Sequence, residues 1–281
     1  MIKNSPITDC YYSFCSYIEH QILNKGQAYT NYGSIFYPTK EVELPNYSVY
    51  GAPFKQFVYD SSVSGAYIPS GVYVNGNFTS KGTTGLMIDH INGRAIFSGG
   101  NNNFTVSGNY AVKDFNIYPT TKSDEQLLYE TKYQINPSFN RQQGPLDKEH
   151  VSIPGIFIIN SNFSNEPYAF GGLQETTIHI HCLILAESKD ALDALGNIMI
   201  DEKYSYFNVI SQTPLTYFGD LKSDPFNYAG LTTSNTSPIL GYISDADFYR
   251  ISNREFTNRY TDLRVGLVDY SIKLVRMTKV Y

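Results

Sequence analysis

The chain has 281 residues, a net charge of −5 and an estimated pI of 5.5. This length suits either one compact core with a sizeable insertion or two modules. The acidic balance and the lack of a long basic run argue against a nucleic-acid-binding surface, although a ring could still pass DNA through an acidic or neutral bore.

Tyrosine is the most unusual part of the composition. The chain has 25 Tyr and 17 Phe but no Trp, and charged residues make up only 17% of it, against about 25% in a typical protein. Aromatic rings lose little conformational entropy when they are ordered, and they are enriched where proteins pack on one another. An AT-rich coding bias would enrich the same residue types, so both explanations stay open.

The cysteines and the N-terminal residues indicate a protein made in the cytoplasm. Cys10, Cys15 and Cys182 fit neither a disulfide framework nor a zinc knuckle, so we expect three buried, reduced thiols. The first residues lack the apolar region of a signal peptide, and no apolar run approaches the roughly 18 residues that a membrane span needs. We therefore expect no membrane partner.

An amphipathic helix is predicted near the N-terminus. Ser5 followed by Pro6 is typical of a capped first turn, and the Asn-Lys-Gly of residues 24–26 ends the helix. The apolar positions recur at spacings of three and four, at Ile7, Tyr11, Phe14, Ile18 and Ile22. We expect this stripe to pack in the core, with a subunit contact as the alternative.

The next hundred residues are predicted to be irregular at first and then rich in hairpins. Prolines interrupt residues 27–73, which favours edge strands and long loops there. Residues 71–119 contain three turn signals, at Asn75-Gly76, Asn92-Gly93 and Ser107-Gly108. The second is the strongest hairpin signal in the chain, because apolar triplets flank it. Residues 124–135 are predicted to form one or two helical turns or a strand, and a polar loop follows them.

The last part of the chain predicts long strands around a second helix. Residues 155–160 and 176–186 are rich in β-branched side chains, and a Gly-containing turn is expected at 167–173. Ser188 is placed to cap a helix that begins after it. Strands are also expected at 206–210, 237–244 and 263–277. In the last of these, apolar residues alternate with Asp269, Ser271 and Lys273, so one face is predicted to be buried and the other polar.

His179 and His181 are the best candidates for a metal site. Residues two apart in a strand point to the same side, so the two imidazoles could share a metal ion. A closed site needs two more ligands, and the remaining histidines lie far off in sequence without a neighbouring group of Cys or carboxylates. The favoured interpretation is therefore a histidine pair on an exposed or interfacial strand face.

No other pattern indicates catalysis. Asp245 and Asp247 resemble a carboxylate pair, but no EF-hand spacing or partner acid follows, so a solvated strand end explains them. The Gly-rich residues 98–103 lack the Lys-Ser/Thr ending of a phosphate loop and lead into a predicted strand. A Gly-x-Ser-x-Gly elbow is also missing. We therefore expect a protein that is not an enzyme, with no catalytic, cofactor-binding or metal-binding residues.

One stretch carries a resemblance to a known family. Residues 175–202 (ETTIHIHCLILAESKDALDALGNIMIDE) form a predicted long strand that runs straight into a short helix. They resemble the centre of the tail-terminator and neck proteins of tailed bacteriophages. The predicted helix at 5–26 and the strand at 263–275 fall where that fold has its first helix and final strand. Residues 85–121, with 154–160 and 166–173, are similar in texture to virion structural proteins of aquatic phages.

The resemblance covers about half of the chain and implies an α+β fold. In this fold, an antiparallel or mixed sheet is flanked by two helices, here built from residues 1–70 and 151–281. Residues 71–150 would be an inserted β-rich module. The resemblance also implies a virion subunit of a closed ring, commonly sixfold. Such a ring joins portal or neck to tail proteins and lets DNA pass.

Other roles stay open. The chain could instead be another tail, collar, baseplate or capsid-decoration subunit, or a receptor- or carbohydrate-binding module. For a ring, we expect one face of each subunit to fit the opposite face of the next. The expected contact regions are the segment Tyr47–Tyr59 and the helix that bears Tyr11, Tyr12, Phe14 and Tyr17.

Overall fold

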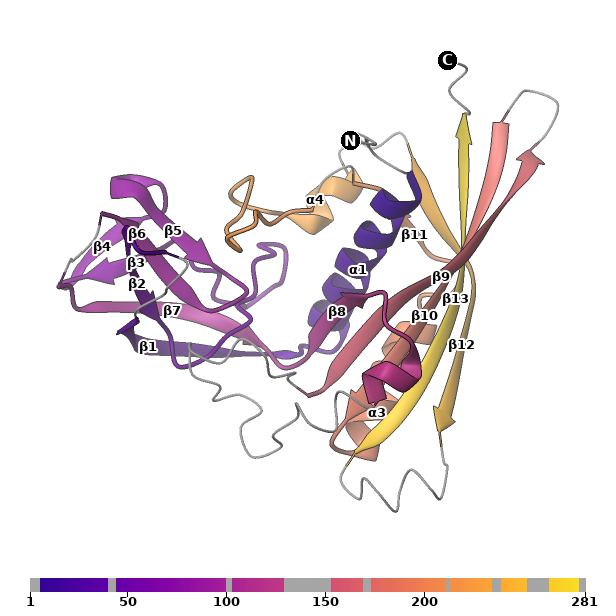
Figure 1. The fold of residues 1–281 in the computed structure, drawn as a ribbon, viewed down its shortest axis with the longest axis horizontal. Helices are drawn as coiled ribbons and strands as arrows, with labels where there is room; N and C mark the ends of the chain where they lie inside the picture. The colour runs from indigo at the N-terminus through magenta and orange to yellow at the C-terminus, as the bar shows by residue number, and fades with distance from the viewer. Residues whose placement is uncertain are drawn as a thin grey trace.

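The computed structural model describes residues 6–39, 44–99, 103–128, 153–168, 173–210, 213–233, 239–251 and 263–277. These residues build two curled sheets, and the helix α1 (Pro6–Lys25) lies between them (Figure 1). In this part of the chain, no helix is long and apolar enough to cross a membrane.

One sheet has seven strands and nearly closes on itself like a small barrel (Figure 1). Its strand order is β4-β3-β7-β1-β2-β6-β5. The bounds are β1 (Tyr29–Thr39), β2 (Tyr47–Gly51), β3 (Gly71–Val74), β4 (Asn77–Ser80), β5 (Leu86–Asp89), β6 (Arg94–Ser98) and β7 (Val106–Lys113). Its interior is aromatic, with the buried rings of Phe57 and Tyr110 stacked at 4.3 Å.

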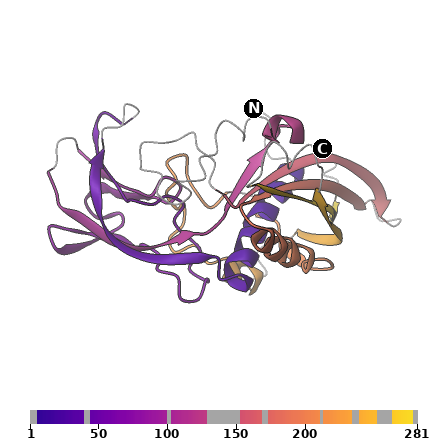
Figure 2. The same ribbon diagram turned by 90° about the horizontal axis from the view of Figure 1, so that it is seen from below.

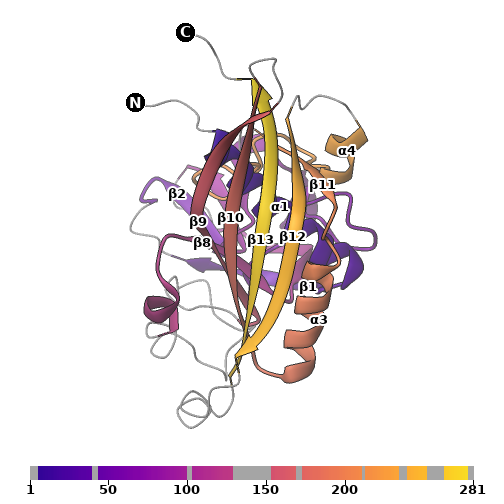
Figure 3. The same cartoon turned by 90° about the vertical axis from the view of Figure 1, so that its right-hand side faces the viewer.

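The other sheet has six strands and forms a half-barrel, seen face-on in Figure 3. Its order is β11-β12-β13-β10-β9-β8. The bounds are β8 (Asn116–Thr120), β9 (Gly155–Tyr168), β10 (Leu173–Ala186), β11 (Tyr206–Asn208), β12 (Leu240–Ile251) and β13 (Arg264–Met277). Only the β8–β9 pairing is parallel among the described strands.

The main core lies between α1 and the inner face of the half-barrel. Phe14, Ile18 and Ile22 of α1 are completely buried there, and each such burial stabilises the fold by about 1.5–3 kcal/mol. The ring of Phe14 meets the ring of Tyr270 edge-on at 4.8 Å. The predicted helix is thus confirmed, and its apolar stripe packs inside the molecule. Ser5, its predicted cap, lies outside the described residues.

The helix α3 (Lys189–Ile200) runs beside the half-barrel (Figure 2). It begins as predicted, because the Ser188 side chain accepts a hydrogen bond from the Ala191 amide at 3.1 Å. A Cβ atom at Gly196 would come within 2.8 Å of the Phe248 ring, so glycine allows the helix to approach the sheet closely. The shorter helical elements are η1 (Thr83–Gly85) and α4 (Tyr228–Thr233).

The predicted α+β fold class is wrong, because the protein is mostly β. Among the residues that the structure describes, strands account for 50% and helices for 20%. The error arose in residues 27–51, where edge strands and loops were predicted. β1 is in fact an interior strand that pairs with β7 on one side and β2 on the other. Its alternation is hard to detect, because Phe36 is its only buried residue.

The two sheets divide the chain differently from the predicted segments. The seven-stranded sheet takes all its strands from residues 29–113, so it includes β1 and β2 from the segment assigned to the core. β8 belongs to the half-barrel. Residues 129–150 of the proposed module lie outside the described residues.

Two of the three predicted turns are confirmed. Asn75 and Gly76 connect β3 to β4 with φ angles of 50° and 84°, as a two-residue hairpin requires. Asn92 and Gly93 lie in the connection between β5 and β6. The turn predicted at Ser107-Gly108 is wrong, since both residues lie inside β7. Residues 114–115 instead carry the chain from one sheet to the other.

Candidate functional site

A group of polar side chains crosses three strands on the outer face of the half-barrel, the face turned away from α1. On β10 and β13, His179 is opposite Ser271 and His181 is opposite Asp269. On β12 and β13, Asp245 is opposite Ser271, and Asp247 is opposite Asp269. Alternate residues of a strand share a face, and the intervening residues fill the inner core. We call this group the outer-face array: His179, His181, Asp245, Asp247, Asp269 and Ser271.

The array brings together both residue pairs that the sequence singled out. The two histidines point to the same side of β10, as predicted, but they have different partners. His179 Nδ1 lies 3.2 Å from Ser271 Oγ. His181 Nδ1 lies 2.5 Å from Asp269 Oδ1, and its Nε2 lies 2.9 Å from Asp124 Oδ2. Asp245 and Asp247 lie within β12 and not at a loop or strand end.

A cavity of about 300 Å³ opens beside the array. It is lined by the array residues His179, Asp245, Asp247, Asp269 and Ser271, together with Ser161, Tyr249 and the core residues Ile180 and Tyr270. Tyr249 is 53% exposed, so its ring is accessible. The cavity therefore combines hydrogen-bonding groups with one aromatic surface.

A lysine partly neutralises the array. Lys203, in the turn after α3, places Nζ 2.5 Å from Asp245 Oδ1. The hydrogen bond from Lys203 holds the pKa of the Asp245 carboxyl below its ordinary value. The same bond raises the pKa of Lys203. Both groups therefore stay charged at neutral pH.

The polar groups of the array can donate and accept hydrogen bonds. A nucleophilic serine needs a base that a third group orients. Ser271 meets His179, but within the described ranges no carboxylate is hydrogen-bonded to the His179 ring. Among the same residues, no three His, Cys, Asp or Glu side chains are arranged to hold a metal ion.

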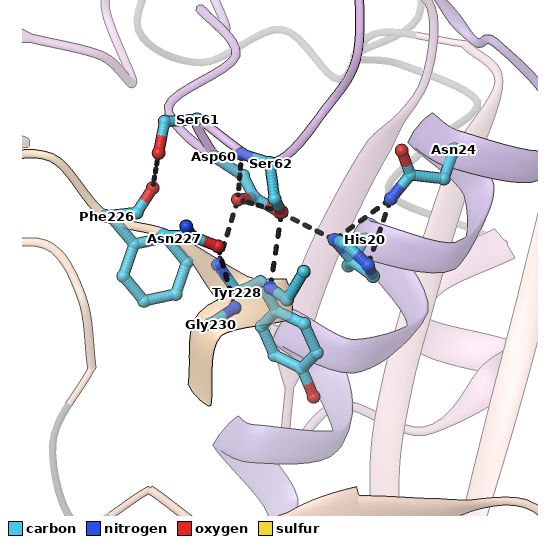
Figure 4. A network of polar contacts seen from close by, with 10 residues as sticks. His20, Asn24, Asp60, Ser61, Ser62, Phe226, Asn227, Tyr228 and Gly230 are labelled. Carbon is cyan, nitrogen blue, oxygen red and sulfur yellow. Dashed lines mark hydrogen bonds and ion pairs between the residues drawn. The ribbon is translucent and has the colours of Figure 1, made fainter. Parts of the chain in front are cut away.

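A second polar cluster joins α1 to two other segments (Figure 4). Asp60 Oδ2 lies 2.6 Å from His20 Nδ1, and Asp60 Oδ1 accepts from the Tyr228 amide at 3.0 Å and from Ser62. Burial favours the neutral form of Asp60, but the hydrogen bonds from His20, Ser62 and Tyr228 outweigh it and lower the pKa of this carboxyl. The cluster holds α1, the segment before β3 and the start of α4 together.

Comparison with known proteins does not assign this chain to a family. No family model matches this chain, and none of the curated proteins matches it. Function is therefore inferred from the residues and their geometry.

Most of the aromatic residues predicted to form contacts are buried in the molecule itself. On α1, Tyr11, Phe14 and Tyr17 are buried, and only Tyr12 is exposed. Within residues 47–59, Tyr47 is 36% exposed and Phe54 is half-buried, whereas the rings at 50, 57 and 59 are buried. The buried rings are therefore not available for the expected subunit contacts, whereas Tyr12, Tyr47 and part of Phe54 stay accessible.

The predicted state of the cysteines is confirmed. Cys10, Cys15 and Cys182 are free and buried. Burial raises the pKa of the Cys10 thiol to about 12, and it also raises the pKa of the Cys15 and Cys182 thiols. The thiols therefore stay protonated and unreactive at neutral pH.

Sequence reasoning missed two residues that contact the array, Asp124 and Lys203. Neither lies in a recognisable motif, and each reaches the array only through the fold. Asp269 and Ser271 were predicted to lie on a polar strand face, and this is confirmed. The polar alternation along β10, β12 and β13 was the available signal, but it gives no register between the strands.

Proposed function

We propose that this chain is a non-enzymatic structural subunit of a bacteriophage virion. In this proposal, it assembles into a ring, commonly sixfold, at the junction between the portal or neck and the tail. The ring contacts the proteins above and below it and lets DNA pass through its bore. Other tail, collar, baseplate or capsid-decoration positions are variants of the same structural role.

The observation that carries this proposal is that different large apolar side chains are exposed at the two sides of the half-barrel. On one side, β11 and β12 and the turn before β11 expose Tyr204, Tyr206 and Leu240 by 63%, 63% and 51%. On the other side, β9 exposes Phe163 and Tyr168 by 54% and 46%, and their five-residue spacing places them on opposite faces of this strand. A head-to-tail ring needs two unlike surfaces that fit each other, and tyrosine-rich, weakly charged patches are suited to protein contacts.

The test is the mass of the purified protein and of two surface variants. Native mass spectrometry should detect a closed oligomer for the wild type. Tyr206→Ser with Leu240→Ser, or Phe163→Ser with Tyr168→Ser, should each give monomers. The control is Tyr73→Ser, because Tyr73 is 40% exposed on the other sheet and should leave the oligomer intact.

Mixing the two variants makes the test sharper. Each variant keeps one intact surface, so the mixture should form dimers through the one remaining interface. A wild-type protein that stays monomeric both alone and with portal, neck or tail proteins would rule out the ring. Oligomers that survive both variants would place the contact elsewhere.

The cavity beside the outer-face array supports a second candidate, a carbohydrate-binding module. Carboxylates and hydroxyls can hydrogen-bond sugar hydroxyls, and the exposed ring of Tyr249 can pack on the apolar face of a sugar. A glycan array should then detect binding that Tyr249→Ala and Asp247→Asn abolish. If no glycan binds, or if binding survives both changes, this second candidate is discarded.

A further inference from the structure

We propose that the His181 ring is a pH-sensitive clasp that fastens residues 121–128 to the outer face of the half-barrel. The clasp works when the ring is protonated and weakens when the ring is neutral. This inference is independent of the ring assembly and of carbohydrate binding.

The geometry of the two hydrogen bonds requires a charged ring. His181 Nδ1 lies 2.5 Å from the Asp269 carboxylate, and His181 Nε2 lies 2.9 Å from the Asp124 carboxylate. Two ionised carboxylates can only accept hydrogen bonds from the ring. Both ring nitrogens must therefore carry a hydrogen, which only the imidazolium form provides. A neutral ring has one N–H group and can donate to only one of the two carboxylates.

The clasp connects two parts of the chain that are far apart in sequence. Asp269 lies on β13, whereas Asp124 begins a helical turn at residues 124–128, just after β8. Three residues further on, Leu127 is 4% exposed and packs against the outer-face side chains Leu183 and Leu185. Loss of the contact with Asp124 therefore loosens the packing of residues 124–128 on this small apolar cluster.

The groups around the His181 ring favour its protonated, positively charged form. Burial lowers the pKa of His181, but the hydrogen bond to Asp269 and the charges of Asp124 and Asp269 outweigh it, so the pKa is raised above its ordinary value. Other titratable or charged groups nearby are His179 on the same strand, Asp247 on β12 and Lys122 in the clasped segment. On β9, the residue opposite His181 is the uncharged Ile159.

The sign of the pH effect follows from this shift. A histidine with a raised pKa in the folded state stabilises the fold fully below its unfolded value of about 6.5. This contribution is lost as the pH rises through the folded-state pKa. The clasp should thus be closed in mildly acidic solution and should open as the pH rises through the folded-state pKa of this ring.

Two measurements on the intact chain test the clasp. Nitrogen-15 NMR should show the His181 ring as imidazolium at about pH 6, with a titration midpoint above that of a free histidine. Hydrogen exchange, corrected for the intrinsic effect of pH, should show several-fold weaker protection of the 123–128 amides at about pH 9 than at about pH 6.

Three variants separate the clasp from a general effect on the fold. His181→Gln should abolish the pH dependence and leave residues 123–128 weakly protected throughout, and Asp124→Asn should weaken the protection at acidic pH. His179→Gln is the control, since this ring contacts Ser271 and not residue 124, and it should behave as the wild type. A neutral His181 ring at about pH 6 would overturn the proposal, and so would protection in the wild type that does not change with pH.

Discussion

Replacing Asp89 with alanine is expected to lower the free energy of unfolding by about 3–5 kcal/mol. Asp89 ends β5 with only 1% exposure. Its carboxylate accepts hydrogen bonds from the Ile91 and Asn92 amides, from the Asn92 side chain and from the Arg94 guanidinium, with Arg94 Nη2 at 2.7 Å. The variant removes the charge that neutralises buried Arg94 and the acceptor that shapes the turn. Urea denaturation at neutral pH measures the loss.

Two further variants show whether the loss of stability comes from breaking a buried ion pair or from removing any one carboxylate. Asp89→Leu combined with Arg94→Leu should recover much of the lost stability, because removing both charges leaves neither one buried alone. Asp247→Ala, at an exposed position, should change stability by less than about 0.5 kcal/mol. A cost below about 1 kcal/mol for Asp89→Ala would contradict this account of the hairpin.

Acidification is expected to destabilise the protein by about 1.4 kcal/mol per pH unit between about pH 6.5 and pH 3. The reason is His90, which is 1% exposed and whose two ring nitrogens have no hydrogen-bond partner in the part of the chain that the structure describes. Burial, with smaller contributions from Lys81 and Lys113, lowers the pKa of this ring to about 3. The unfolded chain binds the proton near pH 6.5, so it is favoured as the pH falls. Denaturant midpoints across this range measure the effect.

The variant His90→Phe isolates this contribution. Phenylalanine keeps the ring contacts with Phe57 and Tyr59 but cannot take up a proton, so the loss of stability above about pH 4 should largely disappear. Asp60 has a lowered pKa and acts only below its unfolded value of about 3.9. His181 acts in the opposite direction, above about pH 6.5. Parallel pH profiles for the wild type and His90→Phe would contradict the assignment to His90.

Elements with strong local signals were predictable from the sequence. The proline and apolar spacing located α1, Ser188 located the start of α3, and β-branched runs located β10 and β13. Each signal depends on neighbouring residues and on steric or capping preferences. The Asn92-Gly93 turn was predicted for the same reason.

Features that depend on distant residues were not predictable. The sequence predicted edge strands where β1 lies. The true position of β1, between β7 and β2, depends on pairing with residues up to about 80 positions away, and local patterns do not report such pairing. The contact of His181 with Asp124 spans 57 positions, and no local pattern predicts it. The sequence predicted only part of the outer-face array. It indicated the pair His179 and His181 and the pair Asp245 and Asp247, but not how their strands align.

The position of α1 has a consequence for the order in which the protein folds during synthesis. The seven-stranded sheet uses residues 29–113 and can pair as soon as these have left the ribosome. The half-barrel cannot form without β13. Phe14 and Ile18 of α1 are therefore buried only after residues about 250 positions later have been made. This helix precedes both sheets in the chain and is among the last elements to be buried, so its apolar stripe stays exposed to chaperones and to aggregation during translation.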